Sequence, residues 1–70
     1  MNIRLGKYRH FKGNEYEVIA IALHSDTCEE MVVYRDLKNN GKVWVRPSVM
    51  WNETIERDGK TFKRFEYIGE

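Results

Sequence analysis

The chain is 70 residues long, which suits one domain (residues 1–70) with a thin hydrophobic core. Hydrophobic residues make up 41% of the chain and charged residues 33%, a composition that excludes an intrinsically disordered protein. Twelve Lys and Arg against 11 Asp and Glu give a formal net charge of +1. This near balance argues against a protein that depends on long nucleic acid for its contacts.

The cysteine count and the hydropathy pattern limit the compartment. A single cysteine, Cys28, excludes an intramolecular disulfide and a cysteine-based metal cluster. No apolar run reaches the length of a membrane span, and the first ten residues lack the apolar core of a signal peptide. We therefore expect a cytoplasmic protein without membrane contact.

The first part of the chain predicts two strands. A short strand from about Lys7 to Phe11 is closed by the turn pair Gly13-Asn14. Residues 15–25 are the longest apolar run, and their β-branched and aromatic side chains favour a strand. Both alternating faces of this run are apolar, so we expect it to be the central strand, covered on both sides.

The middle of the chain predicts a turn and a hairpin. Residues 25–30 ("SDTCEE") combine good N-caps with a capping-box spacing, which predicts one helical turn or a tight loop. Residues 31–37 and 42–46 are predicted strands joined by "KNNG". Pro47 ends the second of these strands, and residues 48–53 fit a short helical turn in which Trp51 packs into the core.

The last stretch, residues 54–68, predicts a hairpin around the turn pair Asp58-Gly59, with Ile55 facing Phe62. In total, five or six short strands with one or two short helical turns predict a mainly β fold. We expect a small antiparallel sheet curled into an SH3-like partial barrel. The alternative is an open meander that dimerises through an edge strand.

The turn "KNNG" decides which side chains share a face. With a two-residue turn, Arg35 faces Arg46, and like charges lie opposite each other, which is unfavourable. With a three-residue loop over Asn39–Gly41, Tyr34 faces Arg46 instead. We favour the second register, which puts Tyr34, Trp44 and Arg46 on one aromatic and cationic face.

Such a face suits a flat, anionic ligand. Trp44 or Tyr34 would stack a nucleobase, and Arg46 would bind a phosphate. We therefore predict a non-enzymatic module that binds a nucleotide-like small anion, with no cofactor and no bound metal. The predicted ligand-binding residues are Tyr8, Arg9, His10, His24, Tyr34, Arg35, Trp44 and Arg46.

Other functions stay open from the sequence. A protein-interaction module would form a homodimer through its edge strands and Trp51, and single-stranded nucleic acid uses the same aromatic and cationic parts. A small hydrolase would rest on His24 and Cys28, which share a face if their segment is helical. Turn formation explains that segment better than catalysis does. The two histidines, His10 and His24, lack the dense spacing of metal ligands.

Three stretches resemble a known family. They are "YRHFKGNEYEV" at residues 8–18, "HSDTCEEMVVYRDL" at residues 24–37 and "VWVRP" at residues 43–47, which is followed by Met50 and an aromatic residue. Together they are similar to a small bacterial family catalogued only as a domain of unknown function. The resemblance covers residues 7 to about 67 and implies a compact, β-rich cytoplasmic protein with related copies in phage genomes. It implies no established activity; sequestering a signalling nucleotide would be one use of the predicted site.

Overall fold

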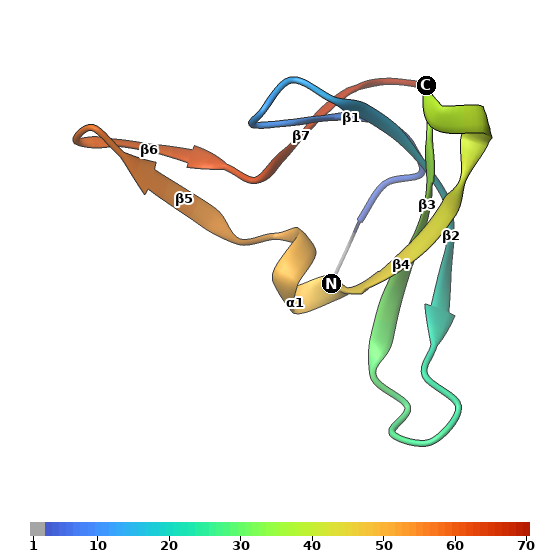
Figure 1. Ribbon diagram of the computed structural model, residues 1–70. Helices are drawn as coiled ribbons and strands as arrows, with labels where there is room; N and C mark the ends of the chain where they lie inside the picture. The colour runs from blue at the N-terminus through green and yellow to red at the C-terminus, as the bar shows by residue number, and fades with distance from the viewer. Residues whose placement is uncertain (1–2) are drawn as a thin grey trace.

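The computed structural model describes residues 3–70; residues 1 and 2 of the predicted domain and the side chain of Asn39 lie outside the described residues. The elements follow one another along the chain (Figure 1): β1 (Gly6–His10), β2 (Glu15–Leu23), β3 (Glu30–Asp36), the 3-10 turn η1 (Asn39–Gly41), β4 (Val43–Pro47), α1 (Ser48–Trp51), β5 (Thr54–Arg57), β6 (Lys60–Lys63) and β7 (Phe65–Gly69). The prediction of a mainly β fold with short helical turns is confirmed. The described chain has seven strands rather than five or six.

Five of the strands form one antiparallel sheet in the order β4-β3-β2-β1-β7, while β5 and β6 form a separate hairpin. Among the described strands β4 and β7 are edges, so the sheet is not a closed barrel. The strands β1 to β4 follow one another as a meander, and the SH3-like curl and dimerisation through an edge stay predictions. Figure 1 shows the β5–β6 hairpin projecting away from the sheet, with α1 linking it to β4.

The hairpin of β5 and β6 has the predicted register, with Ile55 facing Phe62. Asp58 and Gly59 have φ angles of 53° and 75°, as a two-residue turn between twisted strands requires. The ladder stops at β6, and the chain continues as β7, which pairs with β1. The hairpin ends there because Phe65, the first residue of β7, is buried in the core at 4% exposed.

The core is mostly aromatic and centres on Trp51, which is 2% exposed. Its ring stacks on Phe65, with centroids 3.7 Å apart and 3° between the planes. The rings of Tyr34 and Tyr8 lie 4.9 Å and 5.3 Å from it. Aromatic pairs of this kind contribute about 0.5–1.5 kcal/mol each beyond the area they bury. The prediction that Trp51 packs into the core is confirmed, and α1 is the element that inserts it.

The strand β2 is central, as predicted, but it carries a bulge at Ile19. The ladder pairs Val18 with Tyr34 and next pairs Ala20 with Val33, so one extra residue on β2 shifts its alternation. The large apolar side chains Ile19, Ile21 and Leu23 remain 39% to 68% exposed. The prediction that β2 is covered on both sides is therefore wrong for this chain.

The turn between β3 and β4 is longer than either predicted register assumed. The N–H of Asp36 donates to the carbonyl of Lys42 at 2.8 Å, and residues 37–41 lie outside the ladder. Tyr34 faces Trp44 rather than Arg46. Both predicted registers are therefore wrong, because η1 takes up the whole turn.

The observed register of β3 and β4 differs from the favoured one by an even number of residues, because Tyr34 faces Trp44 instead of Arg46. Side chains alternate with a period of two, so an even slip keeps each residue on its face. Tyr34, Trp44 and Arg46 therefore still share one side of the sheet. They differ in burial, because β3 lies inside the sheet and β4 lies at its edge.

Candidate functional site

The predicted stacking ring Tyr34 belongs to the core. It is 8% exposed and packs against Tyr16, Trp51 and Phe65 with ring centroids 4.9 to 6.1 Å away. Tyr8 is 7% exposed, and its hydroxyl donates to the carbonyl of Arg4 at 2.7 Å. Burial raises the pKa of Tyr8 above its ordinary value. Both tyrosines are structural rings in this conformation, and Tyr34 has no free face for a base.

Two of the predicted arginines are held by acids. The guanidinium of Arg9 lies 3.3 Å from a carboxylate oxygen of Glu15, and Arg35 hydrogen-bonds and ion-pairs with Glu17 on the neighbouring strand. Both pairs are exposed, and such pairs contribute little stability, about 0 to 1 kcal/mol. Their local effect is to neutralise charge, so neither arginine adds a net positive charge to an anion site.

His24 organises the β2–β3 loop. Its Nδ1 accepts the backbone N–H of Asp26 at 3.1 Å and that of Thr27 at 3.4 Å. The N–H of Cys28 donates to the carbonyl of His24 at 2.8 Å, and the segment is a tight loop rather than a helical turn. Figure 1 shows this loop at the lower tip of the molecule, away from the β5–β6 hairpin. His24 and Cys28 are therefore separated from the other predicted site residues.

Trp44 and Arg46 lie on the same side of the sheet but differ in their neighbours and in burial. Trp44 is 48% exposed on the edge strand β4. The guanidinium carbon of Arg46 lies 5.6 Å from the ring centroid of Phe65, and its Nε is buried without a hydrogen-bond partner. No carboxylate of residues 3–70 forms an ion pair with Arg46. Arg46 thus remains a cation whose charge is not neutralised by a neighbouring acid.

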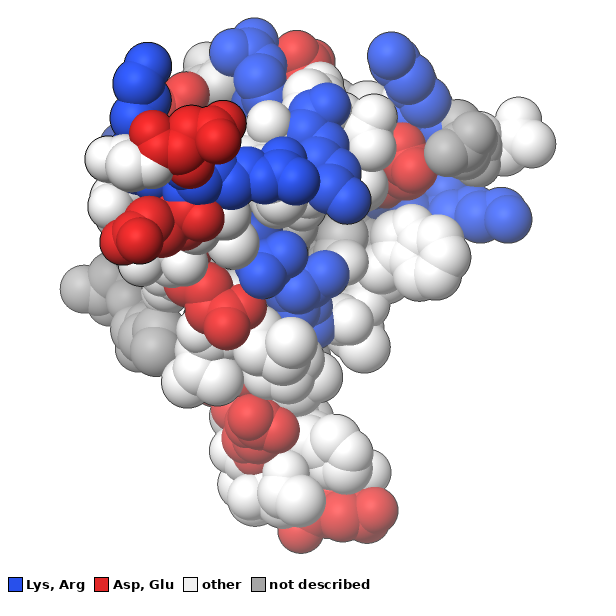
Figure 2. All heavy atoms as spheres, turned by 60° about the vertical axis from the view of Figure 1, so that its left-hand side comes forward, with Lys and Arg blue, Asp and Glu red and all other residues white. Residues whose placement is uncertain are grey.

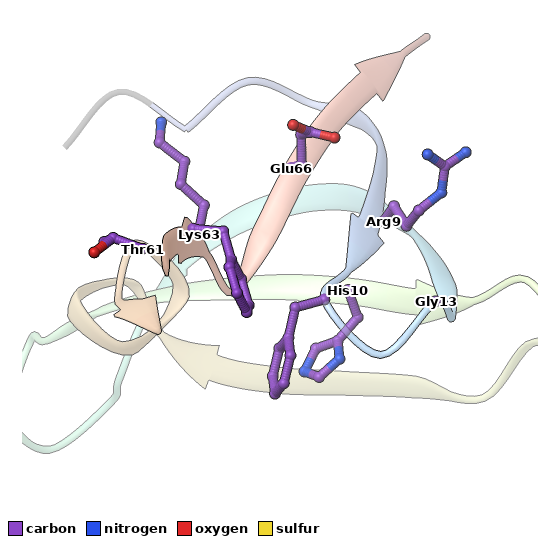
Figure 3. A pocket seen from close by; sticks show the side chains of 8 residues that line it. Arg9, His10, Gly13, Thr61, Lys63 and Glu66 are labelled. Carbon is purple, nitrogen blue, oxygen red and sulfur yellow. The ribbon is translucent and has the colours of Figure 1, made fainter. Parts of the chain in front are cut away.

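An open groove of about 620 Å³ lies between the β1–β2 turn and the β5–β6 hairpin. Figure 3 shows Glu66 between Lys63 and Arg9, with His10 below them in the view. The two walls are fastened together, since the N–H of Phe11 donates to the carbonyl of Arg64 at 2.9 Å. We refer to this hollow as the β1–β6 groove; its lining residues are Arg9, His10, Phe11, Gly13, Thr61, Phe62, Lys63 and Glu66.

Cations gather around the aromatic wall of the groove. The charged groups of Lys12, Arg57 and Arg64 lie 5.8, 5.7 and 5.9 Å from the ring centroid of Phe11. Arg64 lies 3.3 Å from a carboxylate of Glu53, whereas no described acid pairs with Lys12 or Arg57. Figure 2 shows Lys and Arg side chains gathered over the middle of the face turned toward the viewer, with acids on several sides of them. The groove therefore combines aromatic rings with nearby cations and one acid, Glu66.

His10 contributes a neutral hydrogen-bond donor to this wall. Its Nδ1 accepts the backbone N–H of Lys12 at 3.1 Å, which places the proton of the neutral imidazole on Nε2. Burial lowers the pKa of His10, and the nearby charges of Arg64, Arg46 and Lys12 lower it further. An anion bound here would oppose that second effect and favour the protonated ring.

A second groove adjoins the first and measures about 390 Å³. Lys63 and Glu66 line both grooves, so these two side chains lie where the grooves meet. The second groove also contains Tyr67, whose ring centroid lies 4.2 Å from the guanidinium carbon of Arg4. The pairing of an aromatic ring with a cation is thus repeated beyond Lys63.

Residues 3–70 contain no group of three or more His, Cys, Asp or Glu side chains that could hold a metal ion. The same part of the chain has no helix long and apolar enough to cross a membrane. The expectations of no metal, no cofactor and a cytoplasmic location stay predictions.

Comparison with known proteins identifies the family. The family model described as "Protein of unknown function (DUF1653)" matches residues 6–67. The chain belongs to the DUF1653 family. It is also similar to the crystal structure of a DUF1653 protein from Bordetella bronchiseptica, with 34% identity and a TM-score of 0.88 over 97% of this chain and 90% of that one. No curated protein matches.

The family resemblance drawn from the three sequence stretches is therefore confirmed. The DUF1653 family is described as having no known function, so membership supports the fold and brings no activity with it. The site must be argued from the side chains of this chain.

Of the ligand-binding residues predicted from the sequence, Arg9 and His10 line the groove and Arg46 lies over Phe65, but most of the groove was missed. The missed residues are Phe11, Lys12, Arg57, Thr61, Phe62, Lys63, Arg64 and Glu66. The signal was present in two segments, "RHFK" and "KTFKR", each of which sets a phenylalanine among cations. They are about 50 positions apart, and the pairing of β7 with β1 and the Phe11–Arg64 backbone hydrogen bond bring them together.

Proposed function

We propose that this chain is a non-enzymatic binding module for a nucleotide-like small anion, held in the β1–β6 groove. The observation that carries the proposal is the ring of Phe11 surrounded by Lys12, Arg57 and Arg64 at the mouth of an open groove. A flat ring stacks on an aromatic wall, and a phosphate is stabilised by cations such as Lys12 and Arg57, which form no ion pair with an acid of residues 3–70. Few other ligand classes use both features at once.

The size of the groove supports a small ligand rather than a polymer. About 620 Å³ falls in the usual range of small-molecule sites, roughly 300–1,000 Å³. The formal net charge of +1 gives no broad basic surface for a long phosphate backbone. In this proposal Phe11 and Phe62, whose ring centroids lie 5.8 Å apart, contact the base. Lys63 and Arg57 bind phosphate, and His10 donates through Nε2–H.

The test is calorimetric titration of the purified chain with adenosine monophosphate, guanosine monophosphate, a cyclic dinucleotide and a short oligonucleotide. Adenosine and inorganic phosphate are titrated separately as the two halves of the ligand. We expect at least one nucleotide to bind more tightly than either half. At about 100 times its dissociation constant it should stabilise the fold by about 2.7 kcal/mol in thermal unfolding.

A matched pair of lysine variants locates the site. Lys63→Ala removes a charged contact inside the groove and should weaken nucleotide binding by about tenfold or more, since hydrogen bonds to charged groups contribute about 1.5–3 kcal/mol. Lys42→Ala removes another exposed lysine, at the β3–β4 turn, and should leave affinity unchanged. The proposal is contradicted by an absence of binding to every probe, or by equal losses in both variants.

A further inference from the structure

Among residues 3–70, β4 is an edge strand, and its outward backbone groups pair with no other described strand. Asp36 and Lys42 form a hydrogen-bonded pair, since the Asp36 N–H donates to the Lys42 carbonyl. Hydrogen-bonded and non-hydrogen-bonded pairs alternate in an antiparallel ladder, so Trp44 and Arg46 direct their backbone groups toward β3. The N–H and C=O groups of Val43 and Val45 therefore point away from the sheet.

The side chains of β4 do little to protect this edge. Val43, Trp44 and Val45 are consecutive and are 56%, 48% and 61% exposed. Natural edge strands are usually protected by charges, bulges or proline, and β4 has only Pro47 at its end and Arg46 before it. The other edge strand, β7, is irregular: its ladder with β1 has a register shift, and Glu66 lies on it. The two edges therefore differ in their capacity to accept another strand.

We propose that β4 pairs with β4 of a second copy of this chain, antiparallel and about a two-fold axis at Val45. In this register the N–H of each Val45 donates to the Val45 carbonyl of the other copy. The N–H of each Val43 donates to the Pro47 carbonyl of the other copy. Pro47 has no N–H to contribute, but it lies at the end of the ladder, where the loss is smallest. The two sheets join into one.

The charged residues at and beside β4 favour a second copy as the partner and a two-fold axis at Val45 over an axis at Trp44 or Arg46. About an axis at Val45, Trp44 lies opposite Arg46 of the other copy in a close, non-hydrogen-bonded pair, where a cation and an aromatic ring attract each other. An axis at Trp44 would set Arg46 opposite Lys42, and an axis at Arg46 would set two arginines opposite each other. Both arrangements place like charges across the ladder and are unfavourable.

The surface next to β4 supports the same partner. On the side of the sheet that carries Val45, the neighbouring strand contributes Val33 and Met31, which face Val45 and Pro47 across the ladder. A second copy would continue this apolar strip across the axis, with Val45 against Val45. The inference does not rest on the proposed function, because β4 contributes no residue to the β1–β6 groove.

Sedimentation equilibrium of the full chain tests the dimer. Between about 10 µM and about 1 mM, a range that detects micromolar and weaker association, the mean mass should rise from 8.4 kDa toward twice that value. Val45→Lys places two lysines on the axis and should hold the chain at 8.4 kDa. Val49→Lys, at an equally exposed valine of α1, is the control and should still dimerise. Circular dichroism shows whether each variant is folded.

Two substitutions of one residue test the register. Trp44→Glu sets a carboxylate opposite Arg46 of the other copy, whereas Trp44→Lys sets a like charge there. The dimer dissociation constant of Trp44→Lys should exceed that of Trp44→Glu by about tenfold or more, because each dimer contains the pair twice. A wild-type chain that stays monomeric at every concentration overturns the dimer. Equal dissociation constants for the two Trp44 variants overturn the register, as would a dimer that survives Val45→Lys.

Discussion

The β1–β6 groove and the β4 edge both expose an aromatic ring, but the surroundings of the ring differ. In the groove, Phe11 lies among the charged groups of Lys12, Arg57 and Arg64. At the edge, Trp44 lies in a run of valines whose backbone groups are unpaired. A ring among cations suits a flat anion, and a ring on an unpaired strand suits another strand. The neighbours of an aromatic side chain, more than its exposure, decide what it can bind.

The largest expected effect comes from removing the ring that supports both regions. Trp51 stacks on Phe65 behind the groove and is carried by α1, which directly follows β4. Trp51→Ala should destabilise the fold by about 3–5 kcal/mol, the usual cost of a buried aromatic ring, and so weaken both binding and dimerisation. Urea unfolding followed by circular dichroism measures the loss. A loss under about 1 kcal/mol would show that the two regions do not share this core.

A smaller expected effect is a pH dependence that comes from His10 in the groove and leaves the β4 edge unaffected. The pKa of His10 lies below its ordinary value of about 6.5, so the folded chain favours the neutral ring. The unfolded chain therefore binds more protons as pH falls below about 6.5. The stability contributed by neutral His10 is present above that pH and is lost as pH falls toward the lowered pKa. A bound anion offsets the repulsion, so nucleotide affinity should rise over the same interval.

His10→Gln tests this dependence, measured by nucleotide titration and thermal unfolding between about pH 7.5 and pH 5.5, an interval that brackets the ordinary pKa. The variant should lose the part of the pH dependence that belongs to His10, whereas His24→Gln in the β2–β3 loop should keep it. The nucleotide phosphate titrates equally in both experiments, so its contribution cancels when the two variants are compared. The same pH profile in His10→Gln and wild type would contradict the role of the ring. Dimerisation should respond to neither variant.

The smallest expected effect is at Cys28, which lies exposed in the β2–β3 loop, outside both regions. Cys28→Ser should change the free energy of unfolding by less than about 0.5 kcal/mol and leave nucleotide affinity and dimer mass unaltered. Thermal unfolding, titration and sedimentation of the variant check this. A loss of ligand binding in Cys28→Ser would move the site to the β2–β3 loop and favour a role for His24 and Cys28.

Much of the fold followed from local sequence signals. The alternation and the turn residues of residues 54–63 gave the right hairpin register, because Asp58-Gly59 favours one kind of two-residue turn. The turn before β4 could not be read in this way. Asn40 adopts a φ of 63° within a 3-10 turn, and nothing local in "KNNG" distinguishes that turn from a shorter one.

The groove could be predicted only in part. His10 was proposed from its strand, and Arg46 was proposed for an anion that Trp44 and Tyr34 would stack. The structure instead buries Tyr34, leaves Trp44 at the edge and sets Arg46 over Phe65. These outcomes depend on which strand is an edge and on where β7 pairs. Both are long-range choices that alternation along one strand does not encode.

The most direct test of the proposed nucleotide site is residue-by-residue mapping of amide chemical shifts while adenosine monophosphate is added to the ¹⁵N-labelled chain. We expect saturable shifts in two separate stretches, residues 9–13 and residues 61–66, which meet only in the folded groove. The Trp44 indole N–H should remain in place. Shifts centred on Trp44 with residues 9–13 and 61–66 unmoved would contradict the site. A spectrum left unchanged by adenosine monophosphate, guanosine monophosphate, the cyclic dinucleotide and the oligonucleotide alike would contradict nucleotide binding.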